Sequence, residues 1–280
     1  MSEQEGAAGH AAAVRVSGLR KVFVDEGRGE VAAVAGLDFE CRPGEIFGLL
    51  GSNGAGKTTT LRMLSTVLKP SAGEAWVSGA SVLEEPEKVR RRLGFYSAST
   101  ALYPRLSARE TLEFFARINR VEPARLATRV EALIERFGIT PFADARVDKL
   151  SSGMKQKVSI ARTLVHDPPV VIFDEPTVGL DVLSALALID AIQELKEQGK
   201  TVIFSTHILS EAEKLCDRIA VIHGGEILVC DTLEGLRERT GERYLEDIFV
   251  HYVRDAEGAS RQALEEREKQ DLEALEGKKR

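Results

Sequence analysis

A glycine-rich octapeptide limits the fold of this chain more than any other feature of its sequence. It reads Gly51-Ser52-Asn53-Gly54-Ala55-Gly56-Lys57-Thr58, is followed by Thr59, and matches the pattern G-x-x-x-x-G-K-[ST] of phosphate-binding loops. Residues 47–50 before it are typical of a buried strand, and residues 58–68 after it favour a helix. A strand, this loop and a helix in that order predict a P-loop nucleotide site rather than an ordinary glycine-rich turn.

Each residue type in the loop has a physical role in holding phosphate. Glycines let the backbone approach and wrap the phosphates, and the amide groups of the loop and of the helix N-terminus supply positive dipole. The Lys57 ammonium would reach the β- and γ-phosphate oxygens, and the Thr58 hydroxyl would bind Mg²⁺. We therefore expect residues 51–59 to bind the phosphates of a nucleotide together with Mg²⁺.

Two carboxylates end a second apolar run. Residues 170–173 are typical of a strand that is buried on both faces, and Asp174 and Glu175 follow directly. Ligand-binding residues of an open α/β sheet lie at the carboxyl ends of its strands. Asp174 would hold Mg²⁺, usually through water, and Glu175 could polarise the water that attacks the γ-phosphate. Alone, such a run is as often a strand that meets a solvated turn, but beside the P-loop we interpret it as functional.

Strand-like runs that alternate with longer helical patterns predict an α/β fold. These runs are residues 46–50, 170–173, 202–204 and 219–222. Residues 107–166 break the rhythm, because they hold helical patterns and no convincing strand. We expect a helical subdomain, at about residues 98–166, inserted into the sheet domain. Residues 74–77 would begin a small antiparallel section.

Composition narrows the class of protein. The 280 residues are 43% hydrophobic and 29% charged, which suits a sizeable core, and a net charge of −6 argues against a nucleic-acid partner. No apolar run approaches the roughly 20 residues of a membrane helix. Residues 1–13 lack the features of a secretory signal and are expected to form a disordered tail. Three well-separated cysteines without a C-x-x-C pair favour a reducing cytosol.

The C-terminal part is unusually charged. From Arg254 onward, fifteen of twenty-seven residues are charged, and only Leu264, Leu272 and Leu275 are large and apolar. Such a segment cannot bury enough apolar surface to form a core. We interpret residues 241–280 as a charged extension, either a solvated helix or a frayed tail.

The residues before the Asp174-Glu175 strand resemble the signature motif of the ATP-binding subunits of ABC transporters. They read Leu150-Ser151-Ser152-Gly153-Met154-Lys155-Gln156. Serine and glycine that open a helix can donate a hydroxyl and amide groups to phosphate, although alone they would favour a plain helix N-cap. The order of P-loop, helical insert, signature and Asp-Glu strand resembles this family over residues 14–240. The resemblance implies the P-loop NTPase core of ABC ATPases, with ATP and Mg²⁺ as cofactors.

The same resemblance implies a shared site in a dimer. Two subunits of this family sandwich two ATP molecules, so Ser151 and Gly153 would contact the nucleotide of the other subunit. Residues 179–181 resemble the D-loop, which places Asp181 at the ATP interface. His207 resembles the switch histidine, which contacts the γ-phosphate and orients the attacking water. Phe23 resembles the aromatic residue that stacks on adenine, although a strand phenylalanine faces the core as often.

Two positions depart from the family pattern. After the strand-like residues 93–96 the family carries a glutamine, where this chain has Ala98. The hydroxyls that could replace its amide belong to Ser97, Ser99 and Thr100. Ser152 stands where the signature usually has a glycine, and we expect so small a residue to preserve the phosphate contact.

Three further stretches resemble exporter ATPases that serve separately encoded permeases, including those of sodium-extruding systems. They are residues 100–107, 153–157 and 206–213. The resemblance implies ATP hydrolysis by Lys57, Glu175 and His207, which would power sodium efflux through a multi-spanning membrane permease. It also implies a homodimer, or a paired ATPase subunit, that is cytoplasmic and peripheral on the inner face of the cell membrane.

Two other functions stay open. One is a soluble ABC ATPase of translation or DNA repair, but such proteins usually carry two nucleotide modules or long coiled-coil inserts, and this chain shows neither. The other is an interaction module that senses ATP and hydrolyses it poorly. The missing glutamine at Ala98 supports this second alternative.

Overall fold

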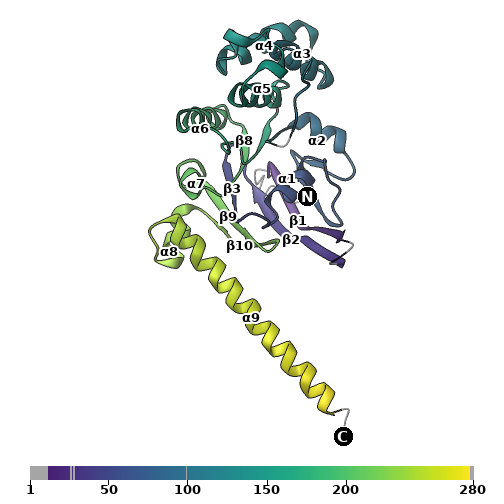
Figure 1. Cartoon of the computed structure of the whole chain (residues 1–280), viewed down its shortest axis with the longest axis vertical. Helices are drawn as coiled ribbons and strands as arrows, with labels where there is room; N and C mark the ends of the chain where they lie inside the picture. The colour runs from purple at the N-terminus through teal and green to yellow at the C-terminus, as the bar shows by residue number, and fades with distance from the viewer. Residues whose placement is uncertain (1–11, 26, 28, 99, 278–280) are drawn as a thin grey trace, which may run out of the picture.

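The computed structural model describes residues 12–277 except Glu26, Arg28 and Ser99, so most of the predicted tail lies outside the described part. Its strands form two sheets (Figure 1). The smaller sheet is antiparallel, with the order β2-β1-β4-β5. Its strands are β1 (Val14–Asp25), β2 (Gly29–Cys41), β4 (Ala72–Val77) and β5 (Ala80–Ser81).

The larger sheet has six strands in the order β10-β9-β3-β8-β7-β6. They are β3 (Ile46–Leu50), β6 (Leu93–Ser97), β7 (Val170–Asp174), β8 (Thr201–Thr206), β9 (Arg218–His223) and β10 (Glu226–Asp231). All neighbours are parallel except β10, which is antiparallel to β9 at the edge. Every residue of β3, β7 and β8 is buried, which explains their continuous apolar sequences. The predicted α/β fold is confirmed.

This strand order brings distant motifs to one edge of the sheet. β8 lies between β3 and β7, and the three strands are parallel, so their carboxyl ends point the same way. The register pairs Leu50 with Thr206 and Asp174 with Ser205. The loop after β3, the end of β7 and the residue after β8 therefore meet.

The helix after the P-loop is shorter than its sequence pattern suggests. α1 (Lys57–Leu64) ends before the predicted limit at residue 68. Thr66 has a left-handed φ of 61°, and the amides of Val67 and Leu68 both donate to the carbonyl oxygen of Arg62. Both bonds satisfy the carbonyl group of Arg62, near the C-terminus of the helix, and close it.

The remaining helices are α2 (Pro86–Arg92), α3 (Ala108–Ile118), α4 (Pro123–Arg136), α5 (Ser152–Leu164), α6 (Val182–Glu197), α7 (Leu209–Leu215), α8 (Leu233–Thr240) and α9 (Leu245–Gly277). Among them, α3, α4 and α5 form the upper part of the molecule in Figure 1, and α9 extends away from the sheets at the bottom. Helices α3, α4 and α5 follow one another between β6 and β7, and 3₁₀ turns at Thr140–Phe142 and Val147–Lys149 lie between α4 and α5. None of the helices in the described part combines the length and apolar character that a bilayer crossing demands.

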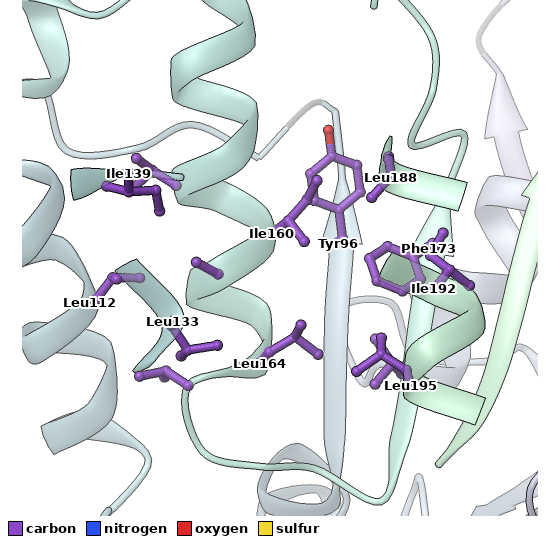
Figure 2. Close-up of a cluster of buried hydrophobic side chains, with 14 of the residues drawn as sticks. Tyr96, Leu112, Leu133, Ile139, Ile160, Leu164, Phe173, Leu188, Ile192 and Leu195 are labelled. Atoms are coloured by element: carbon purple, nitrogen blue, oxygen red, sulfur yellow. The ribbon is translucent and has the colours of Figure 1, made fainter. Parts of the chain in front are cut away.

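Helices α3, α4 and α5 share one core with the central sheet, as Figure 2 shows. Leu112, Leu133 and Ile139 face α5 from one side. On the other side, the rings of Tyr96 and Phe173 lie near side chains of α6. These α6 side chains are Leu188, Ile192 and Leu195. The helical insert is therefore joined to the sheet by continuous apolar packing.

The C-terminal segment begins inside the body of the molecule. Leu245 and Ile248 of α9 are fully buried and cluster with Leu50 and Leu236. Farther along, α9 extends away from the sheets as one long helix (Figure 1). Charge dominates residues 254–280 in the sequence, yet the first turns of α9 bury apolar side chains against β3 and β9 of the larger sheet.

Candidate functional site

The loop between β3 and α1 packs tightly against neighbouring backbone. A Cβ at Gly51 would lie 2.4 Å from the carbonyl oxygen of Ile222, and one at Gly56 would lie 2.7 Å from that of Ala33. Gly56 also has a φ of 109°, which side-chain-bearing residues rarely adopt. Glycine is therefore required at both positions for this loop to follow its course.

A hollow of about 270 Å³ lies over the loop. It is bounded by the loop, by the first turn of α1, by Ala33 of β2 and by Glu175 at the end of β7. The first turn of α1 contains no acidic residue, so its free amide groups keep their positive dipole. A hollow with these walls suits the phosphates of a nucleotide.

Lys57 is held at this hollow although its side chain is only 4% exposed. Its Nζ donates to the carbonyl oxygens of Gly51 at 2.7 Å and Ser52 at 3.2 Å. The same Nζ lies 3.2 Å from Glu175 Oε1. The buried ammonium is thus fixed over the loop, where charge-assisted bonds to phosphate oxygens are strong.

The carboxylate of Asp174 collects hydroxyl groups from three elements. Thr58 Oγ1 and Ser205 Oγ donate to Oδ1 at 3.0 and 2.9 Å, and Ser97 Oγ donates to Oδ2 at 3.3 Å. Thr58 and Asp174 thus present adjacent hydroxyl and carboxylate oxygens. Oxygen donors of this kind, completed by phosphate oxygens and water, suit Mg²⁺. The donor set therefore fits Mg²⁺ bound together with a nucleotide.

Glu175 turns away from Asp174 because its backbone is left-handed, with a φ of 49°. A residue with a side chain keeps such a φ only when its surroundings hold it. Here the Glu175 amide donates to Ser205 O at 3.1 Å and to Ser205 Oγ at 3.2 Å. The turned side chain lies between Lys57 Nζ and His207 Nδ1, and the latter is 3.1 Å from Oε2.

The structure thus connects side chains that were predicted from separate motifs. Lys57 and His207 both pair with Glu175, and Thr58 bonds Asp174. Ser205 connects these two groups, since its Oγ accepts from the Glu175 amide and donates to Asp174. His207 is the most accessible of them, with 43% of its side chain exposed. A carboxylate beside a histidine and a buried cation can orient water next to a phosphate.

Ser151, Gly153 and Asp181 lie in a second group, at the starts of α5 and α6. Ser151 caps α5, since its Oγ accepts from Met154 N at 3.3 Å. Asp181 caps α6 and accepts from Ser184 N at 3.0 Å and from Ser184 Oγ at 2.7 Å. These bonds hold the pKa of Asp181 below its usual value. Ser151 and Asp181 are exposed, and this group does not line the hollow over the P-loop.

Phe23 and Ala98 stand apart from the connected set. The Phe23 ring is 43% exposed on β1, with Lys21 Nζ 5.3 Å from its centroid, so it does not face the core. It is not among the residues that line the hollow over the P-loop. Ala98 and Ser152, the two departures from the family pattern, both line a separate pocket of about 460 Å³.

Of the hydroxyls beside Ala98, that of Ser97 reaches the site. Ser97 is buried at the end of β6 and bonds Asp174, as described above. The Thr100 amide donates to Ser97 O at 3.0 Å, which turns the chain away after β6. Ser99 lies outside the described residues.

Two residues of the site were missed in the sequence. Ser205 supports Asp174 and the Glu175 amide together, and its position beside His207 was the available signal. Glu211 of α7 accepts hydrogen bonds from Thr177 and Thr206, which lie close to Glu175 and His207 in the sequence. Nothing local distinguishes Glu211 from the other charges of its helix.

Comparison with known proteins identifies the family. A family model described as ABC transporter matches residues 34–178. The chain is 42% identical over 221 residues to the ABC transporter ATP-binding protein NatA of Bacillus subtilis (strain 168), covering 79% of this chain and 90% of that protein. It is 37% identical over 229 residues to the daunorubicin resistance ATP-binding protein DrrA3 of Streptomyces coeruleorubidus, and the match covers 82% of this chain and 71% of that protein.

Solved structures agree with the sequence relatives. The ATP-binding subunit of an ABC transporter matches with a TM-score of 0.79 at 29% identity, covering 86% of this chain and 99% of that one. A dimeric ATP-binding cassette in a post-hydrolysis state, bound to ADP and Pi, matches with a TM-score of 0.72 at 26% identity. This match covers 79% of this chain and 98% of that one. The chain therefore belongs to the ABC transporter family and is an ATP-binding, ATP-hydrolysing subunit.

Proposed function

We propose that the chain powers export through a separate membrane permease and that sodium is the transported ion. The observation that carries the ATPase part is a network in which Lys57 and His207 pair with Glu175, and Ser205 links Glu175 to Asp174 and its partner Thr58. Relatives named for linearmycin resistance, daunorubicin resistance and Nod factor export support an exporter. Sodium as cargo rests on the likeness of residues 100–107, 153–157 and 206–213 to ATPases of sodium-extruding systems.

In the proposed mechanism, Lys57 binds the β- and γ-phosphate oxygens and neutralises charge on them. Thr58 and Asp174 would hold Mg²⁺, which would supply further charge neutralisation. Glu175 polarises the attacking water and receives its proton at a carboxylate oxygen. His207 bonds the same carboxylate and orients it and the water toward the γ-phosphate. Phe23 stacks on the adenine.

We further propose a homodimer, or a pair with a related ATPase subunit, with ATP at the interface. Ser151, Gly153 and Asp181 would contact the nucleotide held by the partner, which agrees with their separation from the hollow over the P-loop. Residues 14–240 would be the ATPase domain, and the helical subdomain at residues 98–166 would receive the permease. Residues 1–13 and 241–280 would be a tail and an extension, and the chain would lie on the cytoplasmic face of the membrane.

Affinity capture from detergent-solubilised native membranes tests the transporter assignment. We expect a multi-spanning protein to copurify in nearly equal amount. Cells that carry both proteins should then extrude sodium, measured by an intracellular sodium dye, and Glu175→Gln should stop the efflux. A preparation without a membrane partner would contradict the export function. If the membrane protein copurifies but the intracellular sodium concentration does not change, only the assignment of sodium as the transported ion is wrong.

The second candidate, an ATP-sensing module, is favoured by one observation, the side chain of Ala98 where the family has an amide. Such a module would bind ATP and turn it over hardly at all. Steady ATP hydrolysis by the purified chain, abolished by Glu175→Gln with ATP binding retained, would exclude it. If Glu175→Gln hydrolyses ATP as fast as the wild type, Glu175 is not the base.

A further inference from the structure

Glu211 is a buried carboxylate that lies behind the catalytic loops. The residue is 9% exposed, and its Oε2 accepts from Thr177 Oγ1 and from Thr206 Oγ1, both at 3.0 Å. Thr177 and Thr206 are 4% and 1% exposed. One carboxylate oxygen therefore satisfies two buried hydroxyls that come from different loops.

The two threonines adjoin the residues assigned to hydrolysis. Thr206 directly precedes His207, and its Oγ1 also accepts from the Ile208 amide at 2.9 Å, which pins the backbone on both sides of His207. Thr177 follows Glu175 with one residue between them, and its carbonyl oxygen accepts from the Leu180 amide at 3.1 Å. Each loop is thus anchored to Glu211 beside its functional side chain.

The support behind Glu211 is rigid. It lies on α7, where Ala212 is fully buried and Leu215 is 4% exposed in the apolar clusters of the core. In contrast, His207 and Glu175 meet at the rim of the hollow, with 43% and 21% of their side chains exposed. A bond between two such exposed groups keeps its geometry only when the backbone on both sides is held.

We propose that Glu211 is a positioning residue that sets the Glu175–His207 geometry by linking the loops that carry them. The inference rests on the hydrolytic roles proposed for Glu175 and His207. Glu211 does not reach the nucleotide hollow, whose lining does not include it, and acts through Thr177 and Thr206. Without it, two buried hydroxyls lose their acceptor and the loops can separate.

Steady-state kinetics of Glu211→Ala test the proposal. We expect kcat for ATP hydrolysis to fall on the order of ten- to a hundredfold, since small misplacements of reacting groups are that costly, while KM for ATP stays nearly constant. Glu211→Gln keeps an oxygen that can accept both hydroxyls, so it should restore most of kcat. Unchanged kcat in Glu211→Ala, or no rescue by Glu211→Gln, would overturn the assignment.

A double-mutant cycle separates positioning from general damage. In a His207→Ala background, Glu211→Ala should reduce kcat little further, because the geometry it maintains is already lost. Equal losses in both backgrounds would refute the link to His207. Thr206→Val provides a second test in case Glu211→Ala folds poorly, because it removes one of the two hydroxyls and leaves a similar side-chain volume. This variant should also have a lower kcat, and a normal kcat would contradict the proposal.

Glu45→Ala is the matched control. Glu45 is similarly buried, at 7%, but it pairs with Arg218 at 3.2 Å beside the start of β3, at the opposite end from the P-loop. We expect it to lower stability and leave kcat unchanged; an equal loss of kcat would mean that any buried carboxylate matters. If Glu175→Gln and His207→Ala hydrolyse ATP normally, the proposed function is wrong. If those two variants lose activity and Glu211→Ala hydrolyses ATP normally, only the positioning role of Glu211 is wrong.

Discussion

Asp174 and Glu175 are neighbours in the sequence with different surroundings. Asp174 is 4% exposed and accepts three hydroxyl hydrogen bonds, whereas Glu175 is turned by its left-handed backbone toward Lys57 and His207. In the proposed mechanism the pair divides the work: Asp174 and the Thr58 hydroxyl that it accepts from would hold Mg²⁺, and Glu175 would polarise the attacking water.

His166 gives a prediction about acid stability. Burial lowers its pKa from 6.5 to about 4, and its Nε2 contacts Leu93 O at 3.3 Å. Between these pKa values, the unfolded chain binds a proton that the folded chain does not. The free energy of unfolding should therefore fall as pH drops from 6.5 toward 4, by roughly 3 kcal/mol at about 1.4 kcal/mol per pKa unit.

The measurement is urea unfolding at several pH values for the wild type and His166→Gln. The variant should lose less stability on acidification, because the group that binds the extra proton is gone. Asp167, Lys200 and Arg129 are the charged neighbours that influence this histidine and remain in the variant. His251→Gln, which changes a 42% exposed side chain, is the control. Parallel pH curves for the wild type and His166→Gln would show that His166 has no part in acid unfolding.

At the scale of elements, α9 is tied to the nucleotide-binding core by its first turns. Leu245 and Ile248 pack in one cluster with Leu50, the last residue of β3 before the P-loop. Leu245→Ala should therefore lower the free energy of unfolding by about 2–5 kcal/mol, measured by urea denaturation. Val250→Ala on the same helix, at a side chain that is 40% exposed, should change it by less than about 1 kcal/mol. Equal effects would show that burial at Leu245 does not stabilise the chain.

At the scale of the whole molecule, the two groups of site residues occupy different places. Lys57, Thr58 and Glu175 line the hollow over the P-loop, whereas Gly153 and Asp181 lie at the starts of α5 and α6. α5 is linked to the residue that follows Glu175, because Gln156 Nε2 donates to the carbonyl oxygen of Pro176. In the proposed dimer, this hydrogen bond would couple the contact of α5 with the partner's nucleotide to the backbone beside Glu175.

Gly153→Asp tests this arrangement of two subunits around ATP. A Cβ at Gly153 meets nothing within 4 Å, and an acidic residue in the first turn of a helix is favourable, so the fold should tolerate the change. In a Glu175→Gln background we expect normal ATP binding but loss of the ATP-dependent dimer, because the new carboxylate repels phosphate. Light scattering with and without ATP measures it. If the Gly153→Asp variant still forms the ATP-dependent dimer, Gly153 does not lie at the ATP interface.

Much of the site could be predicted from the sequence because its motifs are local. The P-loop needs glycines at fixed spacing for its backbone, and the apolar strand before Asp174 is continuous because both faces of β7 are buried. Such requirements are met within a few consecutive residues, so they are visible in one sequence. The same holds for the α/β class, which follows from alternating strands and helices.

The contacts between motifs depended on folding. Ser97, Ser205 and Glu211 support the site through partners on other elements, and strand order and register decide which partners meet. The charged composition after Arg254 likewise concealed that Leu245 and Ile248 pack at the core. The spacing of residue types in the sequence therefore determined the local motifs. The contact between Glu175 and His207 was decided by the tertiary structure, because it depends on packing between distant segments, such as the hydrogen bonds by which the buried Glu211 carboxylate joins Thr177 to Thr206.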